Sequence, residues 1–166
     1  MHETPDDLTR LQALLDASIA QAGPFLRTSF EMPAHSLAAA QLAGALQGIV
    51  HVALATVTAK GEPRVAPIGA IVYRGTFYIP TTANAARTRH IRQRPAVSLT
   101  CFRDNGFAVI LHGRAAVLAP GDPAFATLDA QHQASGGPSV LTWGEGVYLR
   151  IEPDVLYSYA RTPDTY

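Results

Sequence analysis

One segment of this sequence combines hydroxyl and cationic side chains at a spacing suited to binding an anion. Thr81 and Thr82 lie in the loop after a strand expected over residues 76–79, and Arg87 follows in the first turn of a short helix expected over residues 84–92. A helix N-terminus exposes unpaired backbone N–H groups and carries a partial positive charge, so hydroxyls and an arginine beside it favour phosphate. We therefore interpret this segment as a candidate anion site, with Arg64 on the preceding strand.

The same arginines have a simpler interpretation. Arg87, Arg89, Arg92 and Arg94 fall on one short helix, and a helix of this composition also fits a face that only contacts solvent. Arg87 is the strongest candidate for a binding role because it alone lies in the first turn. The two interpretations differ in whether Arg87 contacts a ligand.

The charge distribution favours a localised anion site over a generally basic surface. The 166 residues carry 13 Lys and Arg against 13 Asp and Glu, and 48% of them are hydrophobic. Residues 60–94 hold seven basic groups and one acid, whereas residues 1–35 and 95–166 are each acidic by three charges. Net neutrality argues against a general nucleic-acid binder. Twelve of the 13 basic residues are Arg, which suits phosphate or carboxylate but also fits a coding bias.

Other kinds of site find little support. No phosphate-binding P-loop, Gly-x-Gly-x-x-Gly or Gly-x-Ser-x-Gly motif is present. The six histidines are not spaced as metal ligands, so we expect no metal centre, and His51 and His112 are expected to be structural. Cys101, the single cysteine, is expected to be a buried hydrophobe. No signal peptide or 18-residue apolar run is found, so we expect a soluble, cytoplasmic protein that binds no membrane.

The order of the expected elements predicts a mainly β fold, a six- to seven-stranded antiparallel barrel with N-terminal helices. Helices are expected over residues 5–22 and 36–47, and strands over residues 50–57, 64–73, 76–79, 96–102, 107–118, 146–152 and 155–160. A further helix is expected over residues 122–132, and residues 103–106 are expected to form a tight turn. Residues 1–48 should form a helical extension that packs on the barrel of residues 49–166, giving one domain.

Several short segments, in this order, resemble the FMN-binding split β-barrels, which include pyridoxamine 5′-phosphate oxidase and the reductases that use the deazaflavin F420. The resemblance extends from Ile49 to Tyr159. It rests on residues 53–57 (ALATV), 61–69 (GEPRVAPIG), 77–81 (FYIPT), 87–95 (RTRHIRQRP), 112–115 (HGRA) and 149–153 (LRIEP). Each segment is short, and it is their order and spacing that carry the resemblance.

The resemblance implies a homodimer with two flavin sites at the interface, each built from both subunits. The backbone of Pro67, Ile68 and Gly69 would lie along the flavin ring, and Thr81 and Arg87 match the family's phosphate contacts. The remaining candidates are Thr82, Arg64 and Trp143, the last closing the site from the other subunit or simply packing. No catalytic side chain is assigned, because hydride transfer belongs to the cofactor.

The sequence departs from pyridoxamine 5′-phosphate oxidases at positions that matter for their activity. Ala66 stands where those enzymes carry an arginine, Ala85 and Ala86 replace a Ser-Arg pair, and the C-terminal Arg-x-His-x-Arg is absent from residues 158–166. Vitamin B6 oxidation is therefore rejected. The leading hypothesis is an FMN-dependent oxidoreductase acting on a small, unidentified substrate. The alternatives are an F420-dependent reductase and a non-catalytic flavin- or haem-binding protein.

Overall fold

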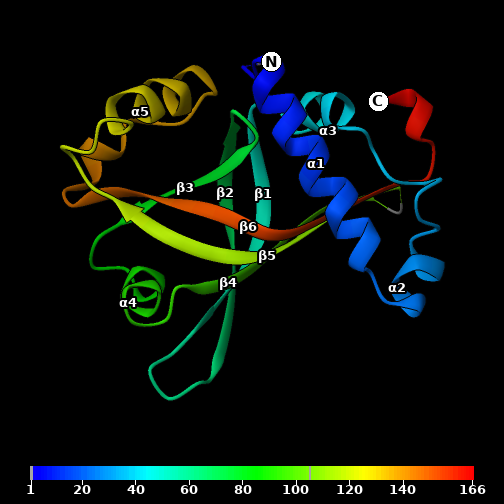
Figure 1. Ribbon diagram of the computed structural model, residues 1–166. Coiled ribbons are helices and arrows are strands. Elements are labelled where there is room, and N and C mark those ends of the chain that lie inside the picture. Colours follow the sequence, from blue (N-terminus) through cyan, green and yellow to red (C-terminus); the bar gives the residue numbers. More distant parts are fainter. Residues whose placement is uncertain (1, 105) are drawn as a thin grey trace.

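Six antiparallel strands form a closed barrel. The computed structural model describes residues 2–104 and 106–166. Within them the strands are β1 (Ile49–Val57), β2 (Pro63–Tyr73), β3 (Thr76–Thr82), β4 (Ala96–Arg103), β5 (Phe107–Leu118) and β6 (Gly146–Ala160). Their order is β1-β2-β3-β6-β5-β4, and β1 pairs with both β2 and β4, which closes the barrel (Figure 1). The predicted mainly β, antiparallel barrel is thus confirmed.

The helices lie around the outside of the barrel. They are α1 (Pro5–Gln21), α2 (Pro24–Ser29), α3 (Ala39–Ala45), α4 (Ala86–Gln93) and α5 (Phe125–Ala134), with short 3-10 turns η1 (Val140–Trp143) and η2 (Pro163–Thr165). In Figure 1, α1 runs across one side of the barrel next to α3, and α5 lies on the opposite side, near β3. No helix of the described residues is long and apolar enough to cross a membrane.

The N-terminal helices are joined to the barrel by both packing and buried hydrogen bonds. Leu11 and Leu15 of α1 belong to the same buried apolar cluster as the inward-facing residues of the strands. On the same helix, the fully buried Ser18 hydroxyl accepts a hydrogen bond from the Leu156 N–H at 2.9 Å. The Ser158 hydroxyl of β6 accepts one from the Leu37 N–H, also at 2.9 Å. These contacts hold α1 and the segment that precedes α3 against β6.

The last strand corrects the prediction of two strands over residues 146–152 and 155–160. β6 runs unbroken through Pro153, because the pairing of β5 with β6 shifts by one residue between His112 and Gly113. The shift leaves Asp154 without a partner in the register, so the break expected at Pro153 is a β-bulge. Gly113 permits the close approach, because a Cβ there would lie 2.1 Å from the Glu152 carbonyl oxygen.

Four other predictions require correction or lie outside the described residues. The second helix is shorter than residues 36–47 and begins after Ala38, whose N–H donates to the Gln41 side chain at 2.8 Å. The helix α2 lies where irregular chain was expected, and α5 begins at Phe125, not at residue 122. The turn expected over residues 103–106 includes Asn105, which lies outside the described residues.

A second, smaller apolar cluster forms beside the barrel. It contains Phe125 and Leu128 of α5, Val140 of η1, Tyr148 of β6 and Leu118 at the end of β5. The Phe125 and Tyr148 rings meet edge to face with their centroids 5.4 Å apart. α5, η1 and the start of β6 therefore pack as one unit against the end of the barrel.

Candidate functional site

Two neighbouring pockets share the side chain of Arg87. The smaller pocket has a volume of about 290 Å³ and lies between β1, β2 and the start of α4. The larger pocket has a volume of about 520 Å³ and lies between β1, β2, β3 and the segment from α5 to η1. Because Arg87 lines both, one elongated ligand could occupy the two pockets together and contact the guanidinium between them.

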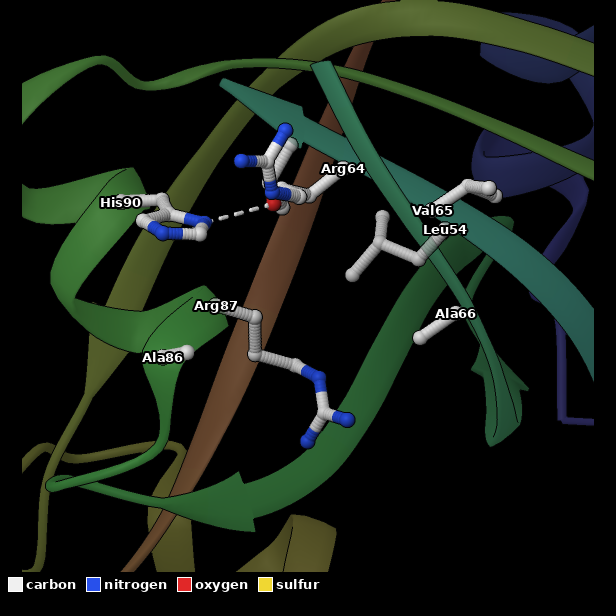
Figure 2. A pocket seen from close by; sticks show the side chains of 8 residues that line it. Leu54, Arg64, Val65, Ala66, Ala86, Arg87 and His90 are labelled. Atoms are coloured by element: carbon white, nitrogen blue, oxygen red, sulfur yellow. Dashed lines mark hydrogen bonds between the residues drawn. The ribbon is translucent and has the colours of Figure 1, made fainter. Parts of the chain in front are cut away.

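The smaller pocket is lined mainly by small, apolar and basic side chains. Figure 2 shows Arg64, Arg87 and His90 around it, with the short side chains of Ala66 and Ala86 leaving space between them. The His90 ring is oriented by a 3.0 Å hydrogen bond between its Nδ1 and the buried Thr56 hydroxyl. Arg64 is exposed and contacts Glu62 at 2.8 Å. This composition suits an anionic group.

The first turn of α4 lies beside Arg87 and has no side-chain cap. Its N-cap residue is Ala85, which has no side-chain atom that could accept a hydrogen bond from the helix N–H groups. Neighbouring polar groups instead fasten the turn to the end of β3. Arg87 donates to the Thr81 hydroxyl at 3.0 Å, and the buried Thr88 hydroxyl donates to the Thr82 carbonyl at 2.7 Å. No side-chain cap among the described residues therefore competes with a ligand for these N–H groups.

The larger pocket is mostly apolar and is walled by elements that are far apart in the sequence. Ile49, Ile68, Gly69 and Pro80 line it from the barrel, and Trp143 lines it from η1. Trp143 is 38% exposed, which is unusual for so large an apolar side chain. A Cβ at Gly69 would approach the Ile49 side chain to 3.2 Å, so a glycine keeps this wall open. A slot of this kind suits a planar ring.

The wall opposite the barrel is held by a buried carboxylate on α5. Asp129 accepts hydrogen bonds from the Ser139 hydroxyl at 2.6 Å, from the Val140 N–H at 2.9 Å and from the Tyr148 hydroxyl at 3.0 Å. Burial opposes ionisation of Asp129, but these hydrogen bonds outweigh it and lower the pKa of the carboxyl. Burial and the neighbouring carboxylate together raise the pKa of Tyr148. Asp129 thus stays ionised and anchors the chain that leads to Trp143.

Most of the residues selected from the sequence come together at these pockets. The larger pocket contains Ile68, Gly69, Thr81, Thr82 and Trp143, the smaller contains Arg64, and Arg87 belongs to both. Trp143 reaches the pocket of its own chain. Pro67 does not line either pocket; it is exposed on β2 and pairs with Ala53 of β1.

The other arginines of α4 lie away from the pockets and donate to backbone carbonyls. Arg89 donates to Asn84, Arg92 to Ala83 at 3.0 Å, and Arg94 to Ala59 at 3.0 Å. All three are exposed. For them the interpretation as a solvent-exposed face fits, whereas Arg87 is half-buried between the pockets.

Sequence reasoning missed several residues that line the pockets. Those in the smaller pocket are Leu54, Thr56, Val65, Ala66, Ala86 and His90, and those in the larger are Ile49, Pro80, His132, Gly136, Gly137 and Pro138. The Gly136-Gly137-Pro138 run was recognisable as a loop, but its return to the barrel depends on the packing of α5. No residue of α1, α2 or α3 lines either pocket.

The chain belongs to the pyridoxamine 5′-phosphate oxidase family, whose sequence pattern it matches over residues 38–150. This match confirms the resemblance inferred from the sequence, which covered nearly the same part of the chain. Among curated proteins none matches this chain.

Solved structures with a similar fold include a heme storage protein, an F420 reductase and an FMN-binding protein. The heme storage protein HutZ from Vibrio cholerae is 16% identical with a TM-score of 0.57, over 66% of this chain and 85% of that one. An F420 reductase is 18% identical with a TM-score of 0.54, over 67% and 91%. A pyridoxamine 5′-phosphate oxidase-related, FMN-binding protein from Nostoc punctiforme is 15% identical with a TM-score of 0.50, over 65% and 72%. At these identities the likeness concerns the fold.

Proposed function

We propose that this protein binds FMN across the two pockets and is an oxidoreductase that transfers hydride to or from a small substrate. The observation that carries the proposal is the pair of pockets joined at Arg87, one basic and one apolar. FMN has the matching form, a phosphate at one end and a planar ring at the other. A pyridoxamine 5′-phosphate oxidase-related protein from Nostoc punctiforme with a similar fold is FMN-binding, and this chain belongs to the pyridoxamine 5′-phosphate oxidase family. Both points support the choice of cofactor.

The smaller pocket fits the phosphate of FMN. Arg87 and Arg64 supply guanidinium donors, and the first turn of α4 supplies backbone N–H groups that no side chain caps. A charge-assisted hydrogen bond from arginine to phosphate is among the stronger polar interactions in proteins. Ala66 and Ala86 stand where pyridoxamine 5′-phosphate oxidases carry arginines. The phosphate would therefore depend on fewer cations here, which makes Arg87 the central one.

The larger pocket fits the flavin ring. Ile68 and Gly69 would face one edge of the ring from β2, and Trp143 would cover it from η1. Neither Asp nor Glu is among the described residues that line the two pockets. A basic, carboxylate-free lining disfavours cationic ligands and is compatible with an anionic cofactor.

When bound, FMN would supply the two-electron chemistry, and the protein would bind and orient it. Thr81, which is 3% exposed, would hold the Arg87 guanidinium in place through its hydroxyl. The apolar side chains of the larger pocket would exclude water from one face of the ring. The substrate would then approach from the side that these residues leave open.

We also propose that two copies of the chain associate and complete each site. Val65 of β2 lines the smaller pocket and is 70% exposed, an unusual position for a β-branched apolar residue at a ligand site. A second subunit that covers Val65 would close the pocket from outside.

The visible absorption spectrum of the purified protein, followed by titration with FMN, F420 and haemin, tests the choice of cofactor. Flavin bands and saturable FMN binding at one per chain are expected. Binding of F420 without binding of FMN would reassign the site to an F420-dependent reductase. A Soret band with no flavin binding would indicate a haem protein.

Electron transfer from the reduced holoprotein tests the oxidoreductase activity separately. The FMN-loaded protein would be reduced anaerobically by light, with EDTA as the electron donor, and mixed with quinone, nitroaromatic and enone acceptors. We expect at least one class to be reduced faster than by free reduced FMN at equal concentration. If the protein accelerates none of them, it is a flavin-binding protein without these activities.

A further inference from the structure

His132 is a buried imidazole at the edge of the larger pocket, and none of the interactions described above accounts for it. It lies in the last turn of α5, is 4% exposed, and lines the pocket together with Gly137 and Trp143. Its Nδ1 is buried and has no hydrogen-bond partner among the described residues. Buried polar atoms are nearly always paired, so an unpaired imidazole nitrogen beside a ligand pocket calls for an explanation.

The contacts of His132 show that it supports the wall of the pocket. Its ring meets Trp143 edge to face at a centroid distance of 6.2 Å and Tyr148 at 6.1 Å. Gly137 packs directly on the ring, because a Cβ there would lie only 2.1 Å from Nε2. The Gly137 N–H also donates to the His132 carbonyl at 3.0 Å. His132 therefore fills the space beneath the turn that carries the wall.

The wall is the chain from Gly136 to Trp143, and α5 holds it at two places. At one place the chain turns over His132, and at the other Ser139 and Val140 donate to Asp129. Gly136 has a φ of +93°, which directs the chain back over α5. The wall supplies Gly136, Gly137, Pro138 and Trp143 to the larger pocket, so its position determines the width of the slot.

We propose that His132 is a positioning residue whose neutral imidazole keeps this wall closed over the ligand, and that protonation of His132 opens it. The proposal concerns the same pocket as the proposed flavin site, and its ligand-binding part rests on that function. A protonated ring would carry two N–H donors beneath Gly137 and Trp143, and the Nδ1–H would have no acceptor. Moving the wall would admit water to the ring and relieve this cost.

The groups that face His132 set the direction of the pH effect. Burial lowers the pKa of His132, while the Asp129 carboxylate and the Pro138 backbone partly oppose it. Asp129, with its lowered pKa, remains ionised between pH 5 and 8, and Tyr148, with its raised pKa, remains neutral. Arg87 lines the same pocket from α4 and adds a positive charge that disfavours protonation. Among His132 and these three neighbouring groups, only His132 changes charge between pH 5 and 8.

Because the pKa of His132 is lowered in the closed state, the stability of the closed wall depends on pH. An exposed histidine in the open state has a pKa of about 6.5, whereas the closed state protonates only at lower pH. The closed wall is therefore fully stable above about pH 6.5 and loses stability as the pH falls towards the pKa of the closed state. Between the two values the ratio of closed to open molecules falls up to tenfold per pH unit, which is roughly the effect of one proton.

Fluorescence of Trp143 tests the wall without any ligand. Trp143 is the single tryptophan of the chain and touches His132, so its emission reports this contact. We expect the emission of the wild-type protein to change between pH 8 and pH 5 with a midpoint below 6.5, and His132→Gln to remove that change. His112→Gln is the matched control, because His112 is exposed on β5 and hydrogen-bonds Ser98 at 2.8 Å. An unchanged titration in His132→Gln would overturn the proposal.

Riboflavin binding at the same pH values tests whether the wall controls the ligand. Riboflavin lacks the phosphate, so its own charge does not change in this range. We expect its affinity for the wild-type protein to fall by more than about twofold and by up to about tenfold from pH 7.5 to pH 5.5, with the midpoint seen by Trp143. The affinity of His132→Gln should change by less than about twofold.

If His132→Gln does not fold, the wild-type protein alone decides: a midpoint at or above pH 6.5, or emission independent of pH, refutes the role of His132. If riboflavin and FMN do not bind at any pH but the emission of Trp143 titrates as expected, the flavin function is refuted and the role of His132 in the wall is upheld.

Gly137→Ala should open the wall at every pH. Gly44→Ala is its control, because a Cβ at Gly44 meets no atom within 4 Å. Normal riboflavin affinity in Gly137→Ala would contradict the packing argument.

Discussion

Replacing Arg87 by alanine removes the side chain that joins the two pockets. Arg87 is half-buried, is held by the Thr81 hydroxyl at 3.0 Å and lines both pockets, so its guanidinium is already positioned for an anion. Losing one charge-assisted hydrogen bond to a phosphate costs about 1–3 kcal/mol. This corresponds to a Kd for FMN that is roughly 5- to 150-fold higher.

Fluorescence titration and calorimetry with FMN and riboflavin measure this effect and locate it. Because riboflavin has no phosphate, Arg87→Ala should weaken its binding much less than that of FMN. Arg89→Ala is the matched control, since Arg89 is exposed on the same helix and donates to the Asn84 carbonyl outside the pockets. Equal FMN affinity in Arg87→Ala and the wild type would refute the assignment of the smaller pocket to the phosphate. It would also mean that the arginines of α4 serve only as a solvent-exposed face.

Further predictions concern stability and assembly. Asp7→Asn should lower the free energy of unfolding at pH 7 by about 0.5–2 kcal/mol, because Asp7 accepts from the Thr4 N–H in the cap of α1. The Thr4 hydrogen bond lowers the pKa of Asp7, so this stabilisation is fully present above pH ~4 and is lost as the pH falls through the folded pKa. In urea unfolding the difference between Asp7→Asn and the wild type should therefore be smaller at pH 3 than at pH 7. Gly113→Ala should lower the free energy of unfolding by about 1–3 kcal/mol in the same assay, because its Cβ would overlap the Glu152 backbone. Stability equal to that of the wild type would contradict the tight bulge. In light scattering the native protein should have twice the mass of one chain, and a monomer would refute the proposed dimer.

The strands of the barrel could be predicted because their side chains alternate with the geometry of a sheet that is buried on one face. In β1, for example, Val50, Val52 and Leu54 point inward and are buried, while the residues between them are more exposed. The bulge opposite Gly113 could not be predicted, because it depends on the pairing of two strands that are distant in the sequence. The prediction that a strand ends at Pro153 was therefore wrong.

The basic part of the candidate site could be predicted more fully than the apolar part. Thr81, Thr82 and Arg87 are neighbours in the sequence, and local rules for helix ends relate them to an anion. His132 and Trp143 reach the larger pocket because Asp129 fastens the intervening chain to α5, an arrangement that only the folded structure shows. The short helix α2 was not predicted, because a Gly-Pro pair is typical of a break in a helix, whereas here Pro24 occupies the first helical position.

Titration of the purified protein with FMN, followed by the emission of Trp143, tests the central claim most directly. The claim is that a flavin ring lies in the larger pocket against Trp143, the single tryptophan of the chain. The account predicts saturable quenching that ends at one FMN per chain and is weakened in Arg87→Ala. Emission that stays constant as FMN is added to the folded protein would contradict it.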